Sequence, residues 1–109
     1  MVEEGNAMNY FATIYTILHY LSCATSLSNP DYWPISAEAL GVDKGQHNAI
    51  FTWLVDESYV AGVEMKIYIN SPNPQIFVFH PRITLAGLAY LEDDPHMRKA
   101  ANISKGIVD

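Results

Sequence analysis

The residue types best suited to reading nucleic acid lie in one short segment of this 109-residue chain. A helical wheel centred on Ile50 places Asn48 and Thr52 on the face opposite the apolar one, and Lys44 lies at the start of the same segment. Asn and Thr side chains can hydrogen-bond to base edges in a DNA major groove, and a lysine can contact phosphate. This face would therefore contact DNA if DNA is bound.

Trp53 lies on the same outward face and indicates a different chemistry. An exposed tryptophan is typical of a residue that anchors a protein interface. Phe77 and Phe79, which share one face of a predicted strand, would extend such an interface. Alternatively, the wheel is off by one position, and the indole packs against the strands or the N-terminal residues. Two functions follow: DNA binding, or an acidic module for protein binding or self-association.

Charge gives little support to DNA binding. The chain has 6 Lys and Arg against 12 Asp and Glu, a net charge of −6, which argues against a nonspecific polyanion binder. The only positive region is the last segment, with Arg98, Lys99 and Lys105. Any bound nucleic acid would need these three residues; the alternative is a solvated face that complements the C-terminus of its helix.

Few residues could support catalysis or metal binding. His19 and Cys23 lie four apart, a spacing that can give two ligands to one metal ion, but structural zinc needs four. We expect both to be partly buried helix residues instead, with Cys23 a small buried hydrophobe. The sequence contains no Gly-rich phosphate loop, nucleophile elbow or CxxC motif. The expectation is a non-catalytic protein without a metal, a cofactor or a small-molecule substrate.

The first half of the chain shows the apolar spacing and the capping residues that are typical of helices. Apolar residues at helical period predict a first helix over about 9–23. Ile35 is expected to be briefly extended, and Ser36 to cap a short second helix that ends before Gly41. A capping box that starts at Asp43 predicts a third helix to about Glu57. The tight connection between the second and third predicted helices is typical of a helix-turn-helix.

The hydrophobic period changes to two after the third helix, which predicts strands over 59–69 and 75–79 joined by a five-residue loop. Pro81 is expected to end the second strand, Thr84 to cap another helix, and 96–108 to form the last one. The order predicts a mostly helical α+β fold, a winged helix-turn-helix with a three-helix core, a two-stranded wing hairpin and a C-terminal helical extension. We expect residues 1–8 to be disordered, 9–92 to form the domain and 93–109 the extension.

The apolar stretch from Ala7 to Ala24 suits neither a signal peptide nor a membrane span. Glu3 and Glu4 precede it where a signal peptide has positive charge, and polar residues interrupt it. A single cysteine cannot form an internal disulfide and suits a reducing compartment. We therefore expect a cytoplasmic protein without membrane contact.

Four segments, 35–41, 54–63, 81–91 and 97–107, resemble the YjcQ family, small winged-helix-like proteins of low-GC Gram-positive bacteria and their phages and prophages. The resemblance covers about residues 10–107 and implies a regulatory or interaction module of phage type. It carries over no catalytic or binding residue. Similar proteins usually have Gly where this chain has Ser58, so a positive φ there would strain the serine.

Overall fold

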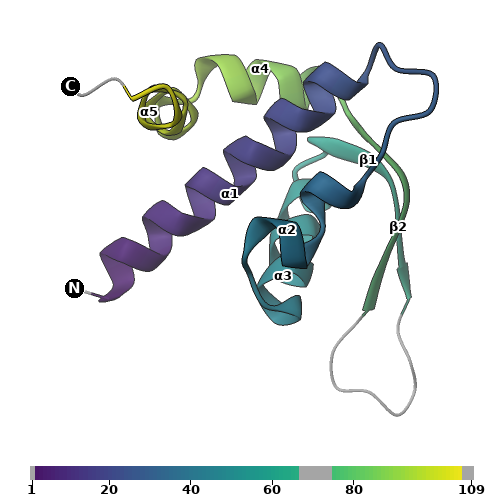
Figure 1. The fold of residues 1–109 in the computed structure, drawn as a ribbon, viewed down its shortest axis with the longest axis horizontal. Coiled ribbons are helices and arrows are strands. Elements are labelled where there is room, and N and C mark those ends of the chain that lie inside the picture. The colour runs from purple at the N-terminus through teal and green to yellow at the C-terminus, as the bar shows by residue number, and fades with distance from the viewer. Residues whose placement is uncertain (1, 67–74, 107–109) are drawn as a thin grey trace.

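A computed structural model describes residues 2–66 and 75–106 of the chain, and the side chains of residues 10–64 and 80–106. These residues form a mostly helical α+β fold with one antiparallel sheet of two strands (Figure 1). In chain order, the elements are α1 (Val2–Ala24), the 3-10 helix η1 (Trp33–Ile35), α2 (Ala37–Leu40), α3 (Lys44–Asp56), β1 (Val60–Lys66), β2 (Gln75–Ile83), α4 (Leu85–Asp93) and α5 (Pro95–Ser104).

The long helix α1 supplies much of the core. Its buried residues recur at helical period, and they form one cluster with apolar residues of α3. The members from these two helices are Ile14, Ile17, Leu18, Leu21, Ile50, Phe51 and Leu54. The apolar faces expected for both helices are thus confirmed. However, α1 begins at Val2 rather than near Asn9, so the segment 1–8, expected to be disordered, is helical from Val2 onward.

Helices α2 and α3 begin and end at the residues that the sequence predicted. The Ser36 hydroxyl accepts a hydrogen bond from the Ala39 amide at 3.2 Å, and Gly41 ends α2 in the left-handed conformation at φ +72°. Asp43 and Gln46 form a complete capping box, with bonds of 2.7 and 3.1 Å between side chain and backbone. Because these bonds satisfy amides that a helix start leaves unpaired, local chemistry alone sets both boundaries.

The segment before α2 differs from the expectation. Ile35 is not extended; it ends the single 3-10 turn η1, in which Pro34 already has the required φ. The turn buries Ile35 and leaves its carbonyl 2.8 Å from Nε2 of His47 on α3. Because a carbonyl only accepts, this ring nitrogen carries the proton. Among the described residues, no third strand joins the hairpin.

Strand β2 continues through Pro81 to Ile83, so the expectation that Pro81 ends it is wrong. Ala61 pairs with Arg82 and Val63 with Val78, which leaves Gly62 alone opposite three residues of β2. Pro81 lies in this bulge, where its missing amide breaks no ladder bond. Gly62 has φ +81°, and a Cβ there would overlap the carbonyl oxygen of His80. Glycine is therefore required at this position of β1.

The turn after α3 is fastened to the start of α4. Thr84 donates from its hydroxyl to the carbonyl of Ser58 at 2.5 Å and from its amide to the carbonyl of Tyr59 at 3.0 Å. Gly87 packs so closely here that a Cβ would overlap the Tyr59 carbonyl oxygen. Ser58 has φ +62°, so its backbone has the positive φ that was expected to strain a serine at this position.

Two tyrosines cover the same turn. The rings of Tyr59 and Tyr90 stack with their centroids 4.4 Å apart. Burial raises the pKa of Tyr90 to about 12, and the nearby Asp94, Tyr59 and Glu57 add to this effect. The phenol therefore stays neutral well above pH 10 in the folded chain.

Replacing Ser58 with glycine should stabilise the protein. Ser58→Gly removes the steric cost of a left-handed serine, roughly 1–2 kcal/mol, and adds some unfolded-state entropy, so we expect a net gain of about 0.5–1 kcal/mol. Urea unfolding measures the change. The matched control is Ser28→Gly, at an exposed serine without a positive φ, which should give no gain. An unchanged or lower stability in Ser58→Gly would contradict the assignment of strain.

Ionisation of Tyr90 should destabilise the fold at high pH. Its pKa is higher in the folded chain, so the folded chain holds the phenolic proton more tightly, and stability falls as pH rises from about 10 to 12. We expect unfolding free energies in urea to fall less between pH 9 and pH 11 in Tyr90→Phe than in the wild type. All other titratable groups are the same in both proteins, so the difference between their two falls in unfolding free energy reports on Tyr90 alone. Equal falls would contradict the raised pKa of Tyr90.

Candidate interaction surfaces

The outer side of α3 carries the residues proposed to read DNA. Lys44 is exposed at the first residue of the helix, and Asn48 and Thr52 follow as half-buried side chains. The Thr52 hydroxyl donates to the backbone carbonyl of Asn48 at 2.7 Å, so its proton is already used within the helix. From Ser36 to Glu57, Lys44 is the only Lys or Arg, whereas four carboxylates belong to Glu38, Asp43, Asp56 and Glu57.

Trp53 is neither fully exposed nor fully packed. Its side chain is 45% exposed, and its ring meets the Tyr10 ring of α1 edge-on, with centroids 5.3 Å apart and an angle of 72° between the planes. The indole thus rests on N-terminal residues, as in the alternative drawn from the sequence, and still leaves nearly half of its surface uncovered. Asp56 and Glu57 follow within one turn, and both are exposed.

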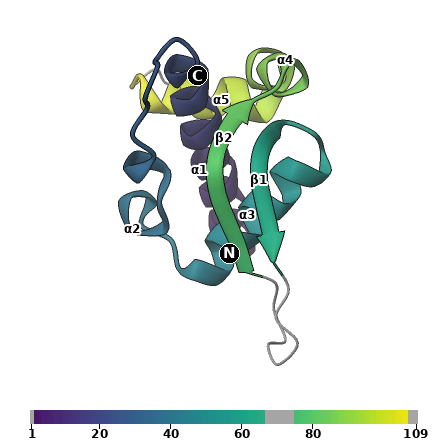
Figure 2. The same ribbon diagram turned by 90° about the vertical axis from the view of Figure 1, so that its right-hand side faces the viewer.

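The basic residues of the last segment lie elsewhere. Figure 1 shows α1 between α3 on one side and α5, which carries Arg98 and Lys99, on the other, and in Figure 2 α5 crosses the upper part of the molecule while α3 lies lower down. Lys105 ends α5 as its C-cap. Within one chain, the residues proposed to bind nucleic acid are therefore split between two sides of α1.

The three cations of this segment also differ in their partners. Arg98 donates from Nε to the Glu92 carbonyl at 3.1 Å and lies 4.0 Å from the Asp93 carboxylate, so it is held at the end of α4. Lys99 and Lys105 form no ion pair within the described part of the chain.

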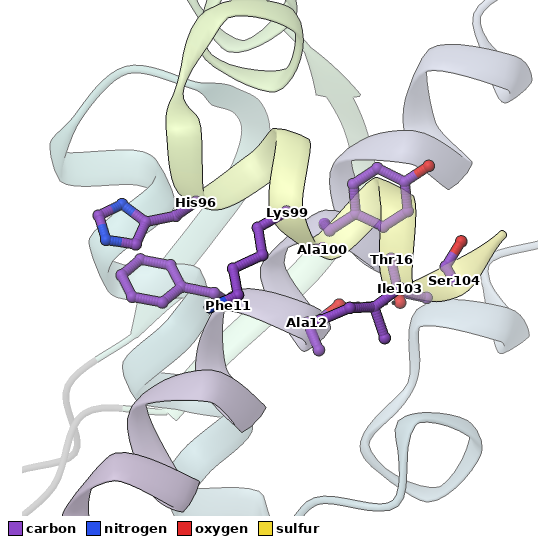
Figure 3. A pocket seen from close by; sticks show the side chains of 9 residues that line it. Phe11, Ala12, Thr16, His96, Lys99, Ala100, Ile103 and Ser104 are labelled. Carbon is purple, nitrogen blue, oxygen red and sulfur yellow. Dashed lines mark hydrogen bonds between the residues drawn. The ribbon is translucent and has the colours of Figure 1, made fainter. Parts of the chain in front are cut away.

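Lys99 borders a largely apolar groove between α1 and α5, with a volume of about 110 Å³ (Figure 3). Its wall on α1 includes Phe11 and Tyr15, and its wall on α5 includes Ala100 and Ile103. Figure 3 shows the Lys99 side chain extending from α5 toward Phe11, whose ring faces that of His96. These two rings stack with centroids 4.2 Å apart.

Sequence reasoning missed this groove. The spacing of Phe11 and Tyr15, four residues apart, is a signal that a second apolar stripe runs along α1 beside the main one. The stripe forms a site only because α5 packs along it.

His19 and Cys23, the two residues at a metal-ligand spacing, lie on the surface of α1. His19 and Cys23 are both exposed, which corrects the expectation of partial burial, and the His19 ring stacks on Tyr15 with centroids 5.4 Å apart. Nowhere in the described ranges do three or more His, Cys, Asp or Glu side chains gather to hold a metal ion.

The predictions for Phe77 and Phe79 fall outside the side chains that the structure describes, and the predicted loop tip from Asn70 to Pro74 lies almost wholly outside the described residues. Of the helices that are described, none is both long and apolar enough to cross a membrane.

Comparison with known proteins gives one match. Residues 15–109 match a family model described as YjcQ protein, which agrees with the resemblance seen in four separate segments. No curated protein and no solved structure matches the chain. Because the match covers most of its length, the chain belongs to the YjcQ family.

Proposed function

We propose that this chain is a non-catalytic winged-helix module of regulatory type. It binds other proteins through the outer face of α3 and does not bind DNA tightly. The fold assignment is supported by the order of α1, α2 and α3 followed by a hairpin, and by the capped, tight connection before α3. The chain departs from a full winged helix at Ile35, where η1 stands in place of a first strand.

The charge of α3 and its neighbouring residues favours a protein over DNA as the partner. A helix that enters a major groove is held largely by Lys and Arg contacts to phosphate, and each neutralised phosphate adds to affinity by releasing counterions. Lys44 alone can supply such a contact between Ser36 and Glu57, and four carboxylates oppose it. The basic residues of α5 cannot compensate within one chain because they lie across α1.

Trp53 supports a protein partner on the same face. Tryptophan is enriched among residues that dominate binding energy, because a large rigid ring buries much area at low entropic cost. Resting against Tyr10 holds the ring in place before binding, while 45% of the side chain stays available. A contact of this kind can tolerate acidic neighbours, unlike a contact to phosphate.

DNA binding tests the proposal directly. We expect fluorescence anisotropy with a mixed-sequence duplex of about 30 bp to give a Kd weaker than about 100 μM at about 50 mM salt, because nonspecific binders typically reach 1–100 μM even at physiological salt. Tighter binding that falls steeply with salt and is lost in Lys44→Ala would overturn the proposal.

Loss of Trp53 should remove protein binding. We expect wild-type protein immobilised on beads to retain partner proteins that Trp53→Ala fails to retain, as quantified by mass spectrometry. The matched control is Trp33→Ala, because Trp33 is 57% exposed but belongs to η1 and not to the outer face of α3. Circular dichroism confirms that both variants fold. Equal retention by wild type and Trp53→Ala would exclude the α3 face as the binding surface.

A further inference from the structure

Two surfaces of opposite charge lie on different sides of α1. The acidic face consists of Trp53, Asp56 and Glu57 at the end of α3. The basic groove is the groove between α1 and α5; Lys99 borders it, and Lys105 caps the end of α5 next to Ser104 of its lining. We propose that the acidic face of one copy of this chain binds the basic groove of the next copy, so that copies associate head to tail. This inference rests on the proposed function and names the partner of the same α3 face.

The groove has the size and lining of a pocket for one side chain. Its volume of about 110 Å³ falls below the roughly 300–1,000 Å³ of sites that bind free small molecules. Phe11 and Tyr15 offer aromatic walls, and Ile103 remains 57% exposed beside them. A large apolar residue from a protein partner fits this lining.

The acidic face supplies both parts of a matching ligand. Trp53 projects nearly half of its side chain, and the carboxylates of Asp56 and Glu57 lie within the next turn of the helix. Lys99 borders the groove, Lys105 follows Ser104 of its lining, and neither forms an ion pair within the described part of the chain. An aromatic anchor beside carboxylates therefore meets an apolar pocket beside ammonium groups, the complementarity that favours one orientation at an interface.

Like charges argue against symmetric pairing. Two grooves placed together about a two-fold axis would bring lysines against lysines, and two acidic faces would bring carboxylates against carboxylates. A two-fold pair could join opposite charges only by using both surfaces of each copy in one interface, and α1 lies between those surfaces. Since α1 separates the two surfaces, one copy can use both at once, and such contacts extend into rings or open chains instead of stopping at a dimer.

Charge reversal of exposed side chains tests the contact without disturbing the core. One variant carries Lys99→Glu and Lys105→Glu, a second carries Asp56→Lys and Glu57→Lys, and a third carries all four changes. Sedimentation velocity measures the mass of each as a function of concentration, and circular dichroism confirms folding. Controls are Arg82→Glu and Glu38→Lys, which reverse exposed charges outside both surfaces.

We expect the wild type and both controls to grow in mass with concentration. Each double variant should associate at least tenfold more weakly. Their equimolar mixture should regain association and grow past a 1:1 pair, because the intact acidic face pairs with the intact groove and the two reversed surfaces are complementary to each other as well. The fourfold variant should regain association, since its charges are complementary again.

Three results would overturn the inference: a wild type that stays monomeric up to about 1 mM, a mass that stops at two copies, or double variants that associate like the wild type. A monomeric chain that still needs Trp53 to retain other proteins overturns this inference alone. DNA binding that depends on Lys44 overturns the proposed function instead.

Discussion

Burial of α1 is the interaction on which the rest of the structure depends. Ile17, Leu18 and Leu21 are almost wholly removed from solvent, and each contributes about 1.5–3 kcal/mol by leaving water. The same helix also meets α5, whose Met97 is fully buried in the common core. A helix covered on more than one side must carry more than one apolar stripe. The consecutive residues Tyr10 and Phe11 accordingly contact α3 and α5 respectively.

The central place of α1 also decides how charge is distributed. Because α3 and α5 pack on different sides of it, the carboxylates near the end of α3 and the lysines of α5 cannot neutralise each other within one chain. The net charge of −6 is thus unevenly spread, with the exposed Asp56 and Glu57 close to Trp53 in the chain and the exposed Lys99 and Lys105 on and next to α5. Such a surface suits contacts between proteins, where opposite charges orient the partners, better than contact with a polyanion.

Close backbone contacts hold the two strands of the hairpin together and fix α4 against the turn after α3. Gly62 lets β1 approach the bulge in β2, and Gly87 lets α4 lie against the turn after α3. Ser58 in that turn takes a conformation that suits glycine better, and the two hydrogen bonds from Thr84 hold it there. Strain at one residue is acceptable because its neighbours fix the turn from both sides.

The sequence by itself determined the features set by neighbouring residues: the capping box at Asp43, the αL end of α2 at Gly41, the apolar stripe of α1 and the alternation of the hairpin. Contacts between distant residues decided the rest. The extent of β2 past Pro81 depends on a bulge opposite Gly62, and the turn at Ile35 on packing against His47. The half-exposed Trp53 and the groove at Lys99 exist because α3 and α5 each pack against α1. No local pattern encodes the packing of two segments more than 80 residues apart in the chain, such as Phe11 and His96, because that contact forms only when the whole core is assembled.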